Sequence, residues 1–140
     1  VITTGRATKF DGTIEQKVAG LRDAWKIFSD RDIPVAALSD IPQIGEATKC
    51  LSERPRDEFD ACARVRAEVL TEPDPFLAAA DETPDIYGID MHPYYCTKSS
   101  CPVVIGGVVV SADTNHLTAT YVSKLAPILE RELRRFGLLE

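Results

Sequence analysis

The sequence predicts an α/β fold, because its beginning has the pattern of a strand, an amphipathic helix and a second strand. Residues 1–4 are a short β-branched run that ends at a glycine. In residues 13–30 the apolar positions recur at steps of four and three, which is typical of a helix with one buried face. Thr13 and Gln16 have the spacing of a capping box at its start. Residues 33–38 are almost continuously apolar, as in a strand buried on both faces, so we expect a parallel, right-handed βαβ unit.

The middle of the chain has a less regular pattern. Residues 57–70 carry apolar side chains on one side and predict a helix. Asp74 and Pro75 have the order of an N-cap and an N1 proline, which predicts a short helix reaching residue 80. Residues 72–84 are rich in proline and acidic residues, which favours a surface connection over a core element. Asp40, in the loop after the second strand, is expected to be a turn residue rather than a catalytic acid.

The last third of the chain predicts three short strands and a long helix. Residues 86–91 form one strand, and residues 103–105 and 108–111 form a hairpin around a Gly-Gly dipeptide. The final helix should begin near residue 117 and kink one turn before Pro127. Its predicted buried stripe comprises Val122, Leu125, Leu129, Leu133 and Phe136.

Length and charge restrict the class of protein. A chain of 140 residues can form one domain with a real core, and we expect a single domain over residues 1–140. The net charge of -6 argues against a nucleic-acid partner, which would require a basic face. The chain starts without a methionine, in a strand that is already under way. We therefore expect it to be the later part of a longer protein.

Four cysteines occur as two pairs that are close in sequence, which favours disulfides and an oxidising compartment. Four cysteines allow three connectivities. Because short loops cost least to close, we predict the bonds Cys50–Cys62 and Cys96–Cys101. The alternative is a zinc site that uses Cys96, Cys101, His92 and His116, but the spacings are not those of common zinc motifs.

Asp113 and His116 are the strongest candidates for catalysis. They lie between the predicted hairpin and the last helix, three residues apart. In a tight turn the carboxylate can accept a hydrogen bond from the ring Nδ1–H, which leaves Nε2 able to take a proton from a serine and return it to a leaving group. The alternative is that Asp113 only caps the turn or helix, where aspartate is favoured. His92, the other histidine, is interpreted as a surface or packing residue.

The run from Cys96 to Tyr121, followed by Leu-Ala-Pro at residues 125–127, resembles the end of an SGNH hydrolase domain. More specifically it resembles the SGNH domains fused behind integral-membrane acyltransferase-3 proteins, in which a cysteine pair precedes a hairpin, a D-x-x-H-L-T motif and the last helix. Residues 1–6 correspond to a strand that ends in an arginine, and residues 35–42 to the next strand with its D-x-P loop. The resemblance implies a three-layer α/β/α, flavodoxin-like SGNH fold that is incomplete at its N-terminus.

The resemblance also implies where the rest of the site lies. The family's nucleophile belongs to a G-D-S motif, and none of the seven serines in this chain has that setting. The partner that completes the site would be the missing N-terminal segment of the same domain. His116 would be the base and Asp113 the residue that orients it. Arg6 is a candidate for binding an oxyanion or substrate. The family usually has an asparagine from this loop in the oxyanion role, so the arginine departs from its pattern. The alternative is an arginine that only faces solvent.

The function implied by the resemblance is acyl transfer to, or ester hydrolysis from, a cell-envelope carbohydrate. The acyl donor would be delivered by a membrane acyltransferase domain of the same polypeptide, which places the domain outside the cytoplasm and tethers it to the membrane. The chemistry requires no metal and no organic cofactor. Two alternatives stay open: a non-catalytic carbohydrate-binding or scaffold domain of SGNH shape, and a stand-alone secreted esterase.

Overall fold

The computed structural model describes the backbone of residues 1–140 and every side chain except that of Thr8. The chain divides into two compact units. The first, which we call the sheet unit, comprises residues 1–40, 71–91 and 130–140. The second contains both disulfides and is called the disulfide unit; it comprises residues 41–70 and 92–129. Each unit is described by itself.

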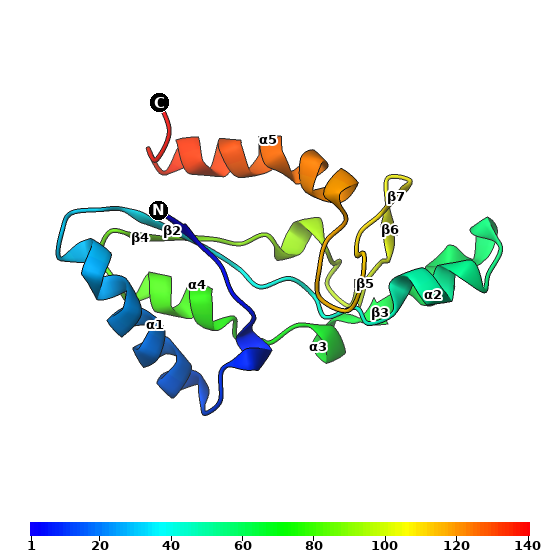
Figure 1. The fold of residues 1–140 in the computed structure, drawn as a ribbon, viewed down its shortest axis with the longest axis horizontal. Helices are drawn as coiled ribbons and strands as arrows, with labels where there is room; N and C mark the ends of the chain where they lie inside the picture. The colour runs from blue at the N-terminus through cyan, green and yellow to red at the C-terminus, as the bar shows by residue number, and fades with distance from the viewer. The chain divides into compact units, whose positions relative to one another are not determined.

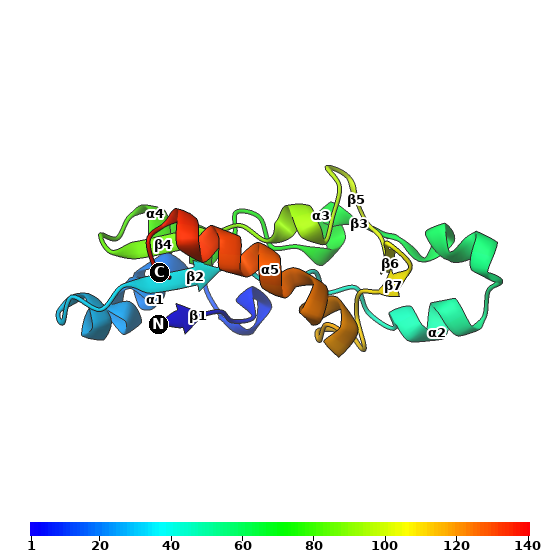
Figure 2. The same ribbon diagram turned by 90° about the horizontal axis from the view of Figure 1, so that it is seen from above.

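The sheet unit is built on three parallel strands, β1 (Ile2–Thr3), β2 (Val35–Leu38) and β4 (Ile86–Ile89). Their order is β1-β2-β4, so β2 is the central strand (Figure 2). The side chains of Val35, Ala36 and Ala37 in β2 are at most 1% exposed, because this strand is covered on both faces. The parallel pairing of β1 with β2 confirms the predicted parallel βαβ arrangement, and the chain is an α/β protein. The right-handed crossover stays a prediction.

Helix α1 (Ile14–Ser29) connects β1 to β2 and begins as the sequence predicts. The Thr13 hydroxyl accepts from the Gln16 backbone, while the Gln16 side chain accepts from the Thr13 backbone at 2.9 Å. The helix buries Trp25 against the ring of Phe76, with 6.5 Å between the ring centroids. The capping box and the apolar stripe therefore set both the start of the helix and the face that it buries.

Helix α4 (Pro75–Asp81) lies in the core, so the expectation of a surface connection over residues 72–84 is wrong. Asp74 caps this helix and Pro75 is its first residue, as predicted. Phe76 and Ala79 are at most 1% exposed and pack with α1. In Figure 1, α1 and α4 lie on one side of the strands and the end of helix α5 (Ala119–Arg135) lies on the other, where Phe136 contacts Tyr87. The acidic residues of this segment flank α4, whereas the position of the helix is determined by its apolar face, which packs in the core.

The disulfide unit consists of short elements. They are α2 (Ala47–Ser52), the 3₁₀ turn η2 (Arg56–Cys62), β3 (Arg64–Val65), α3 (Arg66–Val69), the 3₁₀ turn η3 (His92–Tyr94), β5 (Ser100–Cys101), β6 (Val104–Ile105) and β7 (Val108–Val109). Strands β6 and β7 form the predicted hairpin around Gly106 and Gly107, both of which have positive φ. Strands β3 and β5 form a second antiparallel pair.

The predicted helix over residues 57–70 is wrong, because the chain there forms η2, β3 and α3 in succession. Two tertiary contacts compete with a continuous helix. The disulfide Cys50–Cys62 joins η2 to α2, with 5.9 Å between the two Cα atoms. The following residue pair, Arg64 and Val65, is extended to form a ladder with β5.

The last helix, α5, contains Pro127 and ends at Arg135. Gly137 follows with a φ of 69°, and the Leu138 N–H donates to the Leu133 carbonyl, as in a glycine-terminated helix end. Its predicted stripe is only partly buried. Leu125 and Leu133 are 7% and 6% exposed, whereas Val122 is 49% exposed. The kink before Pro127 stays a prediction.

Candidate functional site

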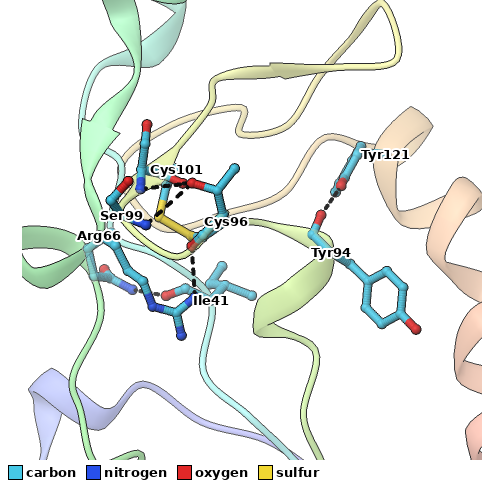
Figure 3. The surroundings of a disulfide bond; sticks show 10 residues. Ile41, Arg66, Tyr94, Cys96, Ser99, Cys101 and Tyr121 are labelled. Carbon is cyan, nitrogen blue, oxygen red and sulfur yellow. Dashed lines mark hydrogen bonds between the residues drawn. A yellow bond between two sulfur atoms is a disulfide. The ribbon is translucent and has the colours of Figure 1, made fainter.

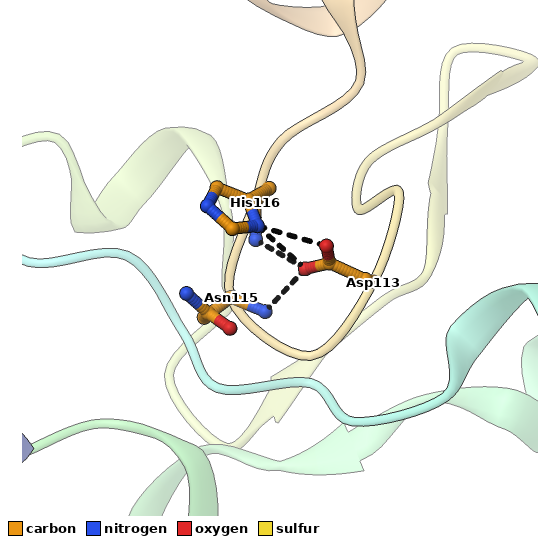
Figure 4. A network of polar contacts seen from close by, with 3 residues as sticks. All are labelled: Asp113, Asn115 and His116. Carbon is orange, nitrogen blue, oxygen red and sulfur yellow. Dashed lines mark hydrogen bonds and ion pairs between the residues drawn. The ribbon is translucent and has the colours of Figure 1, made fainter.

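Asp113 and His116 lie in one turn of the disulfide unit, between β7 and α5 (Figure 4). The Asp113 Oδ1 atom accepts hydrogen bonds from the backbone N–H groups of Asn115 and His116, each at 2.9 Å. These two bonds close the turn and bring the side chains at positions 113 and 116 to the same side. A local sequence spacing of three residues is therefore sufficient to join the pair.

The turn is anchored at its base to buried backbone. Ala112 N–H donates to the His116 carbonyl at 2.8 Å, and Ser111 bridges to Leu117. The Thr118 hydroxyl donates to the Val109 carbonyl at 2.6 Å. Because Ser111 is only 2% exposed, the exposed tip stands on a fixed base. These contacts restrict the backbone on which the His116 ring is mounted.

The His116 ring is oriented by the Asp113 carboxylate. Its Nδ1 atom lies 2.8 Å from Oδ2 and 3.0 Å from Oδ1. With Nδ1 as the donor, the opposite nitrogen Nε2 carries the lone pair, and Figure 4 shows that it points away from Asp113. Nε2 has no hydrogen bond with the described residues. The side chains are 70% exposed for His116 and 56% exposed for Asp113, so the ring is accessible.

The turn also determines the charge of the carboxylate. The backbone N–H of Asn115 is the largest cause that lowers the pKa of Asp113 below its ordinary value, followed by the hydrogen bond with the His116 ring. Asp113 is therefore ionised at neutral pH. An ionised carboxylate at Nδ1 stabilises the imidazolium that forms when Nε2 takes up a proton. The cap and the catalytic interpretation are compatible, because Oδ1 closes the turn while Oδ2 holds the ring.

None of the seven serines of this chain forms a hydrogen bond with His116. Ser111, the serine nearest in sequence, is buried at the base of the turn and bridges through its backbone to Leu117. The structure therefore brings Asp113 and His116 together and places no serine in hydrogen-bond contact with the ring.

Both disulfides are present, Cys50–Cys62 and Cys96–Cys101, and both have the connectivity expected from short loops. Since oxidised cysteines cannot act as thiolate ligands, the zinc alternative is wrong. The described residues also contain no cluster of three or more His, Cys, Asp or Glu side chains that could hold a metal ion.

The turn η3, which precedes the Cys96–Cys101 disulfide, braces the start of α5 (Figure 3). The Tyr121 hydroxyl, on the first turn of that helix, donates to the carbonyl oxygen of Tyr94. Burial raises the pKa of the Tyr121 hydroxyl, so the donor stays protonated at neutral pH. Because α5 follows directly after the turn that carries His116, this brace restrains the turn on its C-terminal side.

The remaining predicted site residues, His92 and Arg6, belong to other elements of the chain. His92 is 4% exposed at the start of η3, as expected for a packing histidine. Arg6 belongs to the sheet unit, directly after β1, and is partly buried. Its Nε atom is buried and has no hydrogen-bond partner.

Two buried aspartates in the sheet unit were not among the predicted site residues. Asp40 and Asp74 are each 5% exposed, and both accept hydrogen bonds from backbone N–H groups. Asp40 is therefore more than a surface turn residue. The available signal was the placement of Ser39 and Asp40 directly after an apolar strand, where a polar pair falls at the carboxyl end of a buried strand.

The sheet unit has the parallel strands and covering helices of an α/β protein, and the disulfide unit holds a carboxylate beside a histidine ring. A family comparison agrees with this class: residues 1–131 match the model described as SGNH domain (fused to AT3 domains). The chain belongs to this SGNH domain family. Comparison with curated proteins and with solved structures found no match.

The family context suggests an acyltransferase- or esterase-like role. Together with the two disulfides it also suggests an extracytoplasmic location and a membrane tether. Among the helices of the described residues, none combines the length and the apolar composition that crossing a bilayer requires.

Proposed function

We propose that this chain contributes the Asp–His half of the active site of a serine-dependent O-acyltransferase or esterase. The observation that supports the proposal is the orientation of His116, whose Nδ1 lies 2.8 Å from the Asp113 carboxylate while Nε2 is accessible. A helix or turn cap alone does not require the ring to be held in this way.

In the proposed reaction His116 Nε2 takes the proton of a serine hydroxyl as the serine oxygen bonds to the acyl carbon. The bond from that carbon to the leaving oxygen then breaks, and Nε2 returns the proton to the leaving oxygen. A sugar hydroxyl or water subsequently takes the acyl group from the serine by the same steps in reverse order. Asp113 holds the ring and balances its positive charge in both halves of the reaction.

The serine belongs to the part of the domain that carries the G-D-S motif, upstream of this chain. With that segment the domain is a three-layer α/β/α SGNH fold, in which residues 1–140 form the C-terminal portion of a single domain. The free edge of β1 supports this view, since β1 is the outer strand of the observed sheet and Ile2 is 54% exposed.

The acceptor in this proposal is a carbohydrate of the cell envelope, and the acyl donor is delivered by a membrane acyltransferase domain. The fusion of the family to AT3 domains supports a membrane partner, and the disulfides support an oxidising compartment. The domain would act outside the cytoplasm, tethered through its parent polypeptide.

The proposal is tested by replacing His116 in the full natural polypeptide and measuring acyl transfer and hydrolysis of an acetyl ester. We expect His116→Ala to lower kcat by about 10²- to 10⁴-fold, because the general base is lost. Asn115→Ala is the matched control, since residue 115 contributes only its backbone N–H to the turn. Its activity should be unchanged.

Equal activity of His116→Ala and the unsubstituted protein would contradict the proposal and favour the non-catalytic carbohydrate-binding or scaffold domain. Ester hydrolysis that depends on His116 in the absence of any membrane domain would instead identify a stand-alone secreted esterase.

A further inference from the structure

Arg6 carries a cationic side chain that the described residues leave without a counter-charge. Its Nε atom is buried and has no hydrogen-bond acceptor, and the guanidinium forms no ion pair with the described residues. A buried donor without an acceptor is unfavourable in the free protein, and a ligand that supplies the acceptor removes this cost. Arginine is suited to such a ligand, because its planar fork of donors matches two oxygens of a carboxylate or phosphate.

The backbone beside Arg6 is held firmly, in contrast to its side chain. Ala7, the next residue, is fully buried and begins the 3₁₀ turn η1 (Ala7–Lys9). Its N–H donates to Asp40 Oδ2 at 2.8 Å, and its carbonyl accepts from Lys17 Nζ at 3.2 Å. Both polar groups of the Ala7 backbone therefore have fixed partners, which restricts the direction in which Arg6 leaves the chain.

Asp40 is itself fixed by a second buried carboxylate. The Asp40 N–H donates to Asp74 Oδ2 at 2.8 Å. The other oxygen of Asp74 caps α4 by accepting from Phe76 N–H at 2.8 Å and from Leu77 N–H at 3.2 Å. A continuous series of hydrogen bonds thus joins the segment after β1, the segment after β2 and the start of α4.

This series lies at the carboxyl ends of β1 and β2. In open sheets of parallel strands, ligands bind outside the carboxyl ends of the strands. The protein as a whole has a net charge of -6, so it does not attract anions through a diffuse field. An anion that binds here must therefore be recognised by a specific cation, and Arg6 is the cation that leaves the chain directly before the fixed Ala7 backbone.

We propose that Arg6 binds the oxyanion of an acidic sugar, and that Asp40 is the positioning residue which holds Arg6 for this purpose by fixing Ala7. A ligand with an oxyanion is chosen because a guanidinium prefers one. The choice of a sugar rests on the proposed function, in which the acceptor is a carbohydrate. The acidic group is a carboxylate or a phosphate, which present the same paired oxygens.

The test measures binding, so that it does not depend on catalysis. Glucuronate, glucose 6-phosphate and glucose are titrated onto the full natural polypeptide by calorimetry, and each variant is checked for an unchanged thermal unfolding midpoint. We expect saturable binding of at least one acidic sugar and none of glucose. Arg6→Gln should weaken that binding by about ten- to a hundredfold, as expected for the loss of a charge-assisted hydrogen bond. The acidic sugar that binds identifies the oxyanion.

Arg31→Gln is the matched control, because Arg31 is exposed just after α1 and its side chain bonds only to the Ile27 carbonyl. It removes the same charge and should leave binding unchanged. The proposal is overturned if neither acidic sugar binds, if glucose binds as tightly, or if Arg6→Gln and Arg31→Gln bind equally well. A failure of acyl transfer with intact, Arg6-dependent binding would reject the proposed function and leave this inference standing.

The positioning role is tested by two substitutions at Asp40. Asp40→Asn keeps a carbonyl oxygen that can accept from Ala7 N–H and should retain binding, whereas Asp40→Ala should weaken it about tenfold. If Asp40→Ala does not fold, the nearly isosteric Asp40→Leu, which also lacks an acceptor for the Ala7 N–H, takes its place. Unchanged acidic-sugar binding in a folded Asp40→Ala or Asp40→Leu protein would overturn the role of Asp40.

Discussion

Substitution of Asp113 by asparagine separates the two tasks of this side chain. In the unsubstituted protein the backbone N–H groups of Asn115 and His116 each lie 2.9 Å from Asp113 Oδ1. The side-chain oxygen of an asparagine can still accept both hydrogen bonds. The second oxygen, 2.8 Å from His116 Nδ1, becomes an NH₂ group, which cannot accept a hydrogen bond from Nδ1–H. Asp113→Asn therefore preserves the turn and reverses the hydrogen bond to the ring.

The reversed bond favours the ring tautomer with the proton on Nε2, so that Nε2 can no longer act as a base. By analogy with serine hydrolases, kcat should fall by about 10²- to 10⁴-fold. The unfolding midpoint should not change measurably, because the pair is exposed and its backbone bonds persist. An activity loss without a stability loss is the expected signature of an orienting acid.

Two measurements check this reasoning. Acyl-ester hydrolysis by the full natural polypeptide gives kcat, and ¹⁵N NMR of the His116 ring reports which nitrogen carries the proton. A tautomer that does not change in Asp113→Asn would refute the geometric argument even if activity fell. A changed tautomer with full activity would refute the catalytic role of the pair.

The carboxyl group of Asp113 gives a pH-dependent prediction. Because the backbone N–H of Asn115 and the His116 ring lower its pKa, the folded protein keeps Asp113 ionised to lower pH than an unfolded chain does. The contribution of the turn is present above the unfolded pKa and is lost as the pH falls through the folded pKa. ¹³C NMR of the carboxyl group should show a midpoint below the ordinary aspartate value; an ordinary midpoint would contradict the observed hydrogen bonds.

Three further predictions concern the framework around the site. A Cβ atom on Gly5 would lie 2.6 Å from Phe76 Cζ in the core, whereas a Cβ on Gly20 meets nothing within 4 Å. Measured by urea unfolding, Gly5→Ala should therefore lower the free energy of unfolding by about 1 to 3 kcal/mol, and Gly20→Ala should raise it by about 0.5 kcal/mol. Asp74→Ala removes the cap of α4 and the acceptor of a buried N–H, so it should lower the free energy of unfolding by about 3 kcal/mol. Asp81 is exposed at the other end of the helix, and Asp81→Ala should change the free energy of unfolding by less than about 0.5 kcal/mol. Peptide mapping of the unreduced protein should recover both disulfides; four free thiols would contradict the structure and remove the argument for an oxidising compartment.

Elements whose signals are local could be predicted. Helix α1 has its capping box within four residues, and α4 has its aspartate cap and proline side by side. The Asp113–His116 pair also lies within one turn, which is why its contact could be expected before the structure. In each case the interacting groups are neighbours along the chain, so residue type and spacing were sufficient.

Elements that depend on distant partners could not be predicted in the same way. The apolar spacing in residues 57–70 fits a helix, but Arg64 and Val65 pair with β5, which lies 35 or more residues further along the chain. The position of α4 in the core, despite its acidic neighbours, similarly depends on Phe76 packing with Trp25 of α1. Local propensity is a weak signal compared with such tertiary contacts.

By itself, the sequence determined the caps, the hairpin and the Asp113–His116 contact, because each of these is specified by residues close in the chain. The α/β class and the first βαβ unit followed from the period of the apolar residues, which marks two strands and the helix between them. The tertiary structure alone decided that Asp40 bonds to Ala7 and Asp74, over separations of 33 and 34 residues, and that Arg6 is left without a counter-charge. The physical reason is that a buried backbone N–H requires a hydrogen-bond acceptor, and the acceptor can be any residue that the fold places beside it. No local sequence pattern predicts which residue that is.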